Sequence, residues 1–361
     1  MNKIRIAGKI FRAEEILAAQ HVGFFAQSPF HQQLLLFLSE WFSAEKTISL
    51  QTSGSTGLPK QITVRKEQMV QSARMTCEFF QLKENEKVLL CLPLDYIAGK
   101  MMVVRSIVGE LDLWPVIPSG HPLVETTSTF DFAAMVPLQV YNTLQSPKEK
   151  QRFSQIKRVI IGGGAIDPQL GEALKDFPND IYSTYGMTET VSHIALQKIN
   201  GEDASGYYTP LPGVSLDLSE EQTLIIHAPH VADDPLLTND IAEIRGDGTF
   251  RIRGRKDNVI NTGGIKVQTE ELERVIRPHI TGNFAITAVP HPKLGEAIVL
   301  LIEAMNNPEL LKRKLEQLLP RFHQPLHILM VESVPQTVSA KTDRAATKKL
   351  AMKIVPLPDS I

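Results

Sequence analysis

Short apolar runs alternate with helical segments through the first half of the chain. The runs at 88–92, 132–136 and 159–161 are typical of buried strands, and each is followed by proline or glycine and then by a helical stretch. Residues 66–80 have helical spacing, with apolar side chains on one face. Strand–loop–helix repetition of this kind predicts a layered α/β domain with a largely parallel sheet.

The first forty-odd residues are interpreted as helical and amphipathic. The apolar run 34–38 is followed at once by Trp41 and Phe42, which gives this segment a strongly apolar face. Residues 47–50 are predicted to form a strand that enters a glycine-rich loop. The chain therefore begins with helices and enters its strands only near residue 47.

A region of alternating apolar and polar positions follows in the second half. Residues 224–228 and 241–244 have the two-residue period of half-buried strands. Asp247 and Gly248, between 241–244 and 250–253, form a good hairpin turn. This pattern favours antiparallel strands over the parallel arrangement predicted upstream.

A shorter alternation of helices and strands forms the C-terminal part of the chain. It begins with a helix at 269–276, continues with two strands, a helix and a strand, and ends with a helix from about Asp343. The length of 361 residues exceeds what one hydrophobic core usually supports. We therefore place a boundary between a large domain, residues 1–256, and a small α+β domain, residues 257–361.

Composition excludes several classes of protein. With 38 basic and 40 acidic residues, the formal net charge is −2, so the chain lacks the basic footprint of nucleic-acid binding and a polybasic membrane patch. No apolar stretch reaches the roughly 20 residues that span a bilayer, and no signal peptide is evident, so we expect a cytoplasmic protein without membrane insertion. The two cysteines, Cys77 and Cys91, rule out a disulfide framework and are expected to be buried.

A loop rich in glycine and hydroxyl groups carries the strongest chemical signal. Its glycines let the backbone approach a ligand and turn amide groups toward an anion, and its hydroxyls can donate to phosphate oxygens. Lys60 supplies a point charge for an outer phosphate, and the N-terminus of the helix that is expected to follow favours negative charge. The spacing is not that of a Walker A loop, and a flexible polar linker is the alternative interpretation. The loop consists of Thr52, Ser53, Gly54, Ser55, Thr56, Gly57, Leu58, Pro59 and Lys60.

This loop resembles the phosphate-binding signature of the adenylate-forming superfamily, which contains acyl-CoA synthetases, peptide-synthetase adenylation domains and luciferases. Four further segments match in the family's order, and the resemblance covers about residues 48–354. It implies a large α/β domain that binds ATP and an acid, followed by a small mobile lid that carries a catalytic lysine. Only 51 residues precede the loop, fewer than the family usually has, so we expect a reduced N-terminal subdomain. An apolar face left exposed there would favour a homodimer.

Two of the matching segments follow predicted strands. Thr184-Tyr185-Gly186-Met187-Thr188-Glu189 resembles the family's nucleotide motif, in which the tyrosine stacks on adenine, the threonine contacts the α-phosphate and the glutamate binds Mg²⁺. A carboxylate oxygen suits that hard cation. Gly162-Gly163-Gly164-Ala165 resembles the wall of the adenine and acyl pocket. Taken alone, Glu189 would be a solvated carboxylate and the glycines a strand-to-helix turn.

The remaining two segments lie in the second half of the chain. By resemblance, Asp240 and Arg255 bind the ribose hydroxyls, and Asp257 is the interdomain hinge. A carboxylate offers two acceptor oxygens to a vicinal diol, and Asn239 stands where the family usually has glycine. Lys341, with Ala340 in place of the usual glycine, resembles the catalytic lysine.

The resemblance implies two half-reactions at one site. A carboxylate attacks the α-phosphate of ATP, while Mg²⁺, Lys60 and Lys341 offset the repulsion between the two anions. The lid then rotates about Asp257 and presents Gly263 and Gly264, which let the pantetheine arm of coenzyme A pass.

Residues 185–196 most resemble o-succinylbenzoate–CoA ligases of menaquinone biosynthesis, whose substrate has two carboxylates. Asp95 and Tyr96 occupy the positions of the family's aromatic-His pair, so no imidazole is assigned there and Tyr96 is taken as a substrate residue. Lys100 or Arg105, on the helix that follows, would bind the second carboxylate, unless both are ordinary surface cations.

Three other functions remain open at this point. The chain could be another aryl- or medium-chain acyl-CoA ligase, a stand-alone adenylation domain that loads a carrier protein, or a non-catalytic nucleotide sensor. A sensor on a degenerate scaffold should have lost at least one of the motif residues. All five of these are present: Lys60, Glu189, Asp240, Arg255 and Lys341.

Overall fold

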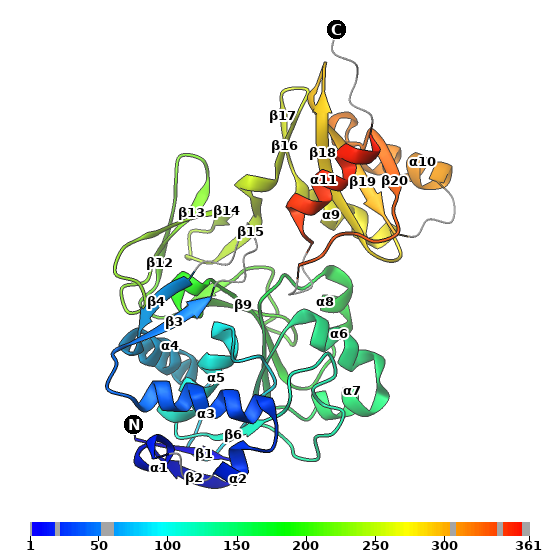
Figure 1. The fold of residues 1–361 in the computed structure, drawn as a ribbon. Coiled ribbons are helices and arrows are strands. Elements are labelled where there is room, and N and C mark those ends of the chain that lie inside the picture. The colour runs from blue at the N-terminus through cyan, green and yellow to red at the C-terminus, as the bar shows by residue number, and fades with distance from the viewer. Residues whose placement is uncertain (1, 19–21, 52–60, 304–307, 338–341, 356–361) are drawn as a thin grey trace.

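A nine-stranded sheet lies at the centre of the larger part of the molecule (Figure 1). The computed structural model describes residues 2–18, 22–51, 61–303, 308–337 and 342–355. In sheet order the strands are β11 (Thr209–Pro210), β10 (His193–Lys198), β9 (Asp180–Gly186), β8 (Arg158–Ile161), β7 (Phe132–Met135), β5 (Lys87–Leu90), β6 (Asp112–Pro115), β1 (Lys3–Ile6) and β2 (Lys9–Arg12). The six strands from β9 to β1 are parallel, and β11, β10 and β2 are antiparallel to their neighbours. The predicted α/β fold class is confirmed.

Helices cover both faces of this sheet. Successive side chains of a strand point to opposite faces, so an apolar strand has apolar side chains to bury on each face. Val88 and Leu90 pack into one buried cluster, and Leu89 and Cys91 into the other. The first cluster receives side chains from α1 (Ala13–Leu17), α2 (Val22–Phe25), α3 (Pro29–Phe42), α4 (Lys66–Phe79) and α5 (Ile97–Val108). The second receives them from α6 (Pro137–Gln145), α7 (Pro147–Phe153) and α8 (Pro168–Leu174).

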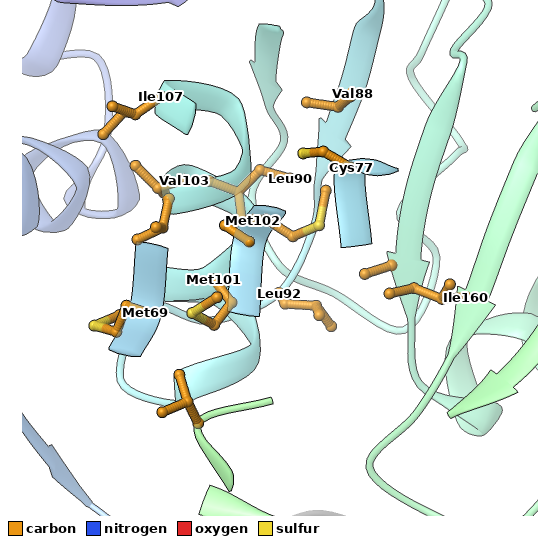
Figure 2. Packing of buried hydrophobic residues seen from close by; sticks show 14 of the residues in the cluster. Met69, Cys77, Val88, Leu90, Leu92, Met101, Met102, Val103, Ile107 and Ile160 are labelled. Atoms are coloured by element: carbon orange, nitrogen blue, oxygen red, sulfur yellow. The ribbon is translucent and has the colours of Figure 1, made fainter. Parts of the chain in front are cut away.

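The core between α4, α5 and the sheet is rich in methionine (Figure 2). Met69 of α4 and Met101 and Met102 of α5 are fully buried, and flexible thioether side chains fill irregular gaps of this kind. Cys77 and Cys91 are free and buried as expected, and burial raises the pKa of their thiols to about 11 and about 12.

The prediction that the chain begins with helices is wrong for residues 3–12. Strands β1 and β2 form a hairpin there, and β1 pairs with β6 at the edge of the large sheet. Ala7 and Gly8, at the turn, both have positive φ (46° and 80°), as a two-residue hairpin turn requires. Ile4 and Ile6 alternate with polar residues and are buried, which is the pattern of a half-buried strand.

The helix predicted at residues 66–80 is confirmed as α4, but the strand between it and the glycine-rich loop was not predicted. Strand β4 (Gln61–Arg65) comes first and pairs along its whole length with β3 (Thr47–Gln51), and α4 begins only at Lys66. The N-terminus of α4 is therefore separated from the loop by a strand of five residues. Alternating Ile62 and Val64 favour this strand, because β-branched side chains fit a pleated surface.

An antiparallel sheet of four strands follows, as the alternating pattern predicted. Its strands are β12 (Ser215–Leu218), β13 (Thr223–His227), β14 (Leu236–Ile244) and β15 (Phe250–Arg255). The hairpin between β14 and β15 is confirmed: Gly248 has a φ of 82°, and Asp247 accepts hydrogen bonds from the backbone and side chain of Thr249. An isolated bridge between Tyr208 and Phe250 joins the edge of this sheet to the segment before β11.

The last hundred residues form a separate sheet with its own buried clusters. The strands are β16 (Val259–Thr262), β17 (Ile265–Gln268), β18 (Phe284–His291), β19 (Gly295–Ile302) and β20 (His327–Met330), and the helices are α9 (Thr269–Ile276), α10 (Pro308–Leu318) and α11 (Arg344–Ile354). The clusters of this part begin at Ile260 and share no residue with the two upstream clusters, which extend to Phe250. The boundary at 256/257, the mobility of this part and the homodimer stay predictions. None of the helices in the described ranges is long and apolar enough to cross a membrane.

The hairpin at residues 3–12 can be tested by a matched pair of substitutions. Ile6→Ala should lower the free energy of unfolding by about 2–5 kcal/mol, because Ile6 is fully buried and its removal leaves a cavity. Ile10→Ala on the partner strand should change it by no more than about 0.5 kcal/mol, because that side chain is 48% exposed. Urea denaturation measures both, and equal effects would contradict the hairpin.

Candidate functional site

The carboxyl ends of β8 and β9 bring the glycine segment and the nucleotide motif together. A Cβ atom on Gly162 would lie 2.3 Å from Oγ1 of Thr184, so any other residue here would displace the threonine side chain. Gly163 follows with a φ of 78°, and Gly164 and Ala165 continue the same loop after β8. The segment predicted to form a pocket wall therefore lies directly against the strand that carries Tyr185.

A hydrogen-bonded chain connects β9 to the four-stranded sheet. The hydroxyl of Tyr185 donates to Oδ2 of Asp240 at 2.6 Å, and Nη1 of Arg255 lies 3.4 Å from the other carboxylate oxygen. Asp240 and Arg255 are direct neighbours in the pairing of β14 with β15. Burial, with the charge of Asp240, raises the pKa of Tyr185, so the phenol stays protonated and is the donor. Three residues predicted separately as nucleotide ligands are thus in contact.

Asp257 lies at the end of the same chain of contacts. Its Oδ2 accepts from Nη2 of Arg255 at 3.1 Å and from Nδ2 of Asn239 at 3.0 Å. Asn239 stands where glycine was expected, and its amide contacts a residue 18 positions away in the sequence. The sequence predicts only a changed turn at this position and gives no sign of the bond to Asp257, because no local pattern connects the two positions.

A tight turn after β9 presents Thr188 and Glu189. A Cβ atom on Gly186 would lie 2.3 Å from the carbonyl oxygen of Ser192, so glycine is again required. Thr188–Thr190 form a single 3₁₀ turn, and the side chain of Glu189 is exposed. Within the described ranges Glu189 has no hydrogen bond or ion pair, so its carboxylate is available to a cation or to solvent.

Helix α5 places the two candidate cations in different surroundings. Nζ of Lys100 lies 3.4 Å from the carbonyl oxygen of Ser49 and 5.4 Å from the ring centroid of Phe37, near the surface. Arg105 is 2% exposed, so it is not an ordinary surface cation. Tyr96 precedes the helix at its N-cap position and is half-buried. Lys100 and Arg105 therefore do not form one site.

Sequence reasoning gave no role to the residues that surround Arg105. Its Nε donates to Oγ1 of Thr76 at 3.2 Å, and its Nη2 donates to Oγ of Ser192 at 2.6 Å. Buried His193 lies 3.2 Å from the same Oγ1 of Thr76. Burial and the charge of Arg105 lower the pKa of His193 well below its usual value, so the imidazole is neutral at pH 7. Ser192 and His193 lie within the stretch 185–196 that supported the resemblance, and this was the only signal that could have pointed to them.

Several predicted site residues lie elsewhere in the molecule or outside the described part. Gly263 and Gly264 form the turn between β16 and β17, with φ values of 58° and 80°, and the ring of Phe322 lies against Gly263. The predicted residues outside the described ranges are Thr52, Ser53, Gly54, Ser55, Thr56, Gly57, Lys60 and Lys341. The structure thus brings together the β8–β9 residues with Asp240, Arg255 and Asp257. Lys60 and Lys341 lie outside the described ranges, so their roles stay predictions.

Comparisons with known proteins identify the family to which the chain belongs. A model of the AMP-binding enzyme family matches residues 24–232, more than half of the chain. The structure of an AMP-forming acyl-CoA synthetase/AMP-acid ligase II-like protein from Dyadobacter fermentans is 34% identical, covers 89% of this chain and 94% of its own, and superposes with a TM-score of 0.62. The chain therefore belongs to the AMP-binding enzyme family, and its resemblance to the adenylate-forming superfamily is confirmed.

Several relatives carry the name of an enzyme that acts on a defined acid. The 2-succinylbenzoate–CoA ligase of Escherichia coli is 25% identical over 313 residues, which are 82% of this chain and 67% of that enzyme. The enzyme of the same name from Haemophilus influenzae is 29% identical over 76% of this chain and 64% of its own length. The chain thus spans about two thirds of these relatives. The structure of an E. coli MenE variant with bound OSB-AMS, 24% identical with a TM-score of 0.68, covers 84% of this chain and 68% of its own and shows the same fold.

The bond between Tyr185 and Asp240 predicts a measurable contribution to stability. Tyr185→Phe removes one donor to a partly buried carboxylate and should lower the free energy of unfolding by about 1.5–3 kcal/mol. Tyr141→Phe, on the exposed face of α6, is the matched control and should change it by no more than about 0.5 kcal/mol. Urea denaturation of both variants is the measurement, and a Tyr185→Phe variant as stable as the control would contradict the bond.

Proposed function

We propose that the protein is an ATP-dependent, AMP-forming acid–thiol ligase that converts 2-succinylbenzoate to its coenzyme A thioester. The observation that carries the proposal is the convergence of Tyr185, Asp240 and Arg255 next to the Gly163–Ala165 loop in a chain of the AMP-binding enzyme family. The identity of the acid is supported by the two curated relatives that carry its name, at 25% and 29% identity.

In this proposal the nucleoside binds between the ends of β8, β9 and β14. Adenine lies against Tyr185 and the loop of Gly163, Gly164 and Ala165, with Thr184, Gly186 and Met187 as neighbours. Asp240 accepts hydrogen bonds from the ribose diol, and the ion pair with Arg255 orients this carboxylate. Because Tyr185 already donates to Asp240, the adenine and ribose positions are aligned before the nucleotide arrives.

In the same proposal, the phosphates and the metal ion bind at the turn after β9. The exposed carboxylate of Glu189, without a protein partner in the described ranges, fits a hard dication that keeps water and phosphate as its other ligands. Mg²⁺ bound there would neutralise phosphate charge. Thr188 donates to the α-phosphate, and the glycine-rich loop with Lys60 holds the outer phosphates, as the resemblance implies.

The first half-reaction joins two anions. An oxygen of the acid's carboxylate forms a bond to the α-phosphorus, the bond to the bridging oxygen breaks, and pyrophosphate leaves with the electron pair. Lys341 offsets the negative charge that develops on these oxygens. The product is an acyl-adenylate, an acid with AMP as its leaving group.

The second half-reaction transfers the acyl group to sulfur. The thiol of coenzyme A attacks the acyl carbon, loses its proton and expels AMP. The C-terminal part turns about Asp257 between the two steps, which withdraws Lys341 and brings Gly263 and Gly264 to the pantetheine arm. Two glycines with positive φ and no side chains suit a narrow passage.

A pyrophosphate-release assay across a panel of carboxylic acids tests this function directly. We expect release with 2-succinylbenzoate, and thioester formation only when coenzyme A is added. Transfer to a phosphopantetheinyl carrier protein instead would identify an adenylation domain, and preference for a simple aryl or alkyl acid would identify another acyl-CoA ligase. Absence of release with every acid would contradict the proposal.

The role of Lys341 predicts a large effect on the first half-reaction. Lys341→Ala should slow pyrophosphate release about a hundredfold or more, because one preorganised charge is lost from the reacting centre. Lys349→Ala, an exposed lysine on α11, is the control and should leave the rate unchanged. Adenylate formation at the wild-type rate in Lys341→Ala would remove Lys341 from the mechanism.

A further inference from the structure

An ion pair connects the four-stranded sheet to the C-terminal part of the chain. Nη1 of Arg253, on β15, lies 3.8 Å from Oε1 of Glu271, in the first turn of α9. Asp257, the proposed hinge, lies between these two residues in the sequence. A turn of the C-terminal part about Asp257 therefore moves Glu271 relative to Arg253.

The strand β15 and the start of α9 are in close contact at the same place. Oε2 of Glu270 accepts a hydrogen bond from the amide of Arg255 at 3.4 Å. A Cβ atom on Gly254 would lie 2.5 Å from Oε1 of Gln268 and 2.8 Å from Oε2 of Glu270. Because glycine has no Cβ atom, the side chains at the start of α9 can lie directly on this strand. The ion pair is thus one part of a contact that fixes the orientation of the C-terminal part.

Arg253 has a second partner on its own side of the hinge. Oε2 of Glu243, on β14, accepts hydrogen bonds from Arg253 and, at 2.9 Å, from Nη2 of Arg251. Hydrogen bonds from Arg251, Tyr207 and Arg253 lower the pKa of Glu243 to about 2, so this carboxylate stays charged at pH 7. Glu243 therefore holds the guanidinium of Arg253 in place, whether or not Glu271 is near.

Glu271 also has a second partner, within its own helix. Nη2 of Arg274 lies 3.5 Å from the same Oε1 of Glu271. Separation of Arg253 from Glu271 thus leaves each charge paired, and both side chains are partly exposed, at 33% and 47%. An exposed pair of this kind favours one arrangement by about fivefold or less. The contact can therefore open and close without a large cost.

The orientation that this contact holds is not the one that the second half-reaction needs. Figure 1 shows the hairpin of β16 and β17 directed away from the nine-stranded sheet. The turn of this hairpin, Gly263 and Gly264, lies at its end remote from Asp257. In the proposed reaction this turn meets the pantetheine arm next to the acyl group, so the C-terminal part must leave its present position before coenzyme A reacts.

We propose that Arg253 and Glu271 form a latch that holds the C-terminal part in its present orientation and opens before the thiol of coenzyme A attacks. This proposal rests on the proposed function, and it adds to that function the residues that divide the molecules between the two orientations. Arg253 and Glu271 are positioning residues, because they act on the orientation of the C-terminal part and not on the reacting atoms. We call the pair the Arg253–Glu271 latch.

The latch should affect the two half-reactions unequally. With about one molecule in ten in the turned orientation, a fivefold weaker latch raises that fraction to about one in three. Because only the turned molecules use coenzyme A, the half-saturating concentration of coenzyme A falls about threefold. The fraction in the present orientation falls only from about nine tenths to about two thirds, so pyrophosphate release slows less than about twofold.

Rapid mixing of the full-length protein measures both steps. The protein is first incubated with ATP and 2-succinylbenzoate, which gives the rate of pyrophosphate release, and is then mixed with coenzyme A at several concentrations. Glu271→Gln should lower the half-saturating concentration of coenzyme A about threefold and slow pyrophosphate release less than about twofold. Glu316→Gln, which removes the same charge from an exposed position on α10, is the matched control and should change neither value.

Arg253→Gln separates the latch from a general effect of charge. Coenzyme A is an anion, so loss of an arginine would weaken its binding if simple attraction were at work, and loss of a glutamate would strengthen it. The latch predicts the same fall of about threefold for Arg253→Gln as for Glu271→Gln, because each variant breaks the same contact. The double variant should show no further fall, since the two residues act as a pair. A loss of stability would instead reduce the maximal rates of both steps.

The outcomes distinguish the latch from the function on which it rests. Opposite effects of the two single variants, or no effect of either in a protein that forms the thioester, would overturn the latch and leave the proposed function intact. Wild-type protein that forms no thioester after the addition of coenzyme A would overturn the proposed function and the latch with it.

Discussion

The parallel pairing of the central strands is the constraint on which the site depends. A parallel sheet buries both faces, so its strands are mostly apolar, and polar chemistry gathers at the ends of the strands and in the loops that follow them. Because β8 and β9 are hydrogen-bonded neighbours that run the same way, their carboxyl ends bring the loop of Gly162–Ala165 against the motif that begins at Thr184. Two glycines lie at close approaches there: Gly186 packs against the backbone of Ser192 and leaves no space for a side chain, and Gly162 packs against the hydroxyl of Thr184. The backbone thus fixes the site before any ligand contact is considered.

Polar contacts extend this arrangement across the molecule. Tyr185 connects the large sheet to the four-stranded sheet through Asp240, and Arg255 connects Asp240 to Asp257, just before the C-terminal sheet begins. A second group of contacts runs from Ser192 through Arg105 to Thr76, in the core between α4 and α5. One short segment, residues 184–193, therefore takes part in both groups of contacts, through Tyr185 in the first and through Ser192 in the second.

Sequence patterns predicted those parts of the molecule whose structure depends on interactions between residues close together in the sequence. The buried strands, the turn at Asp247-Gly248 and the helix Thr269–Ile276 were predicted correctly, because apolar period and turn chemistry act over a few residues. The hairpin at 3–12 was missed, since its strands have four residues each and its turn uses Ala7 at a positive φ where glycine or asparagine would have been a signal. The contacts between Asn239 and Asp257 and between Arg105 and Ser192 join positions 18 and 87 residues apart, which no local pattern encodes. These two contacts could be identified only from the tertiary structure.

The contacts of Asp257 lie next to the predicted boundary between the two domains. Both the Asn239 and the Arg255 contacts are exposed, and an exposed polar pair of this kind contributes about 1 kcal/mol or less. Each contact can therefore bias one orientation over another by roughly fivefold at most. In the proposed reaction, in which the C-terminal part turns about Asp257, such contacts would be broken at little cost in free energy, and added salt would weaken the ionic contact because mobile ions screen exposed charges.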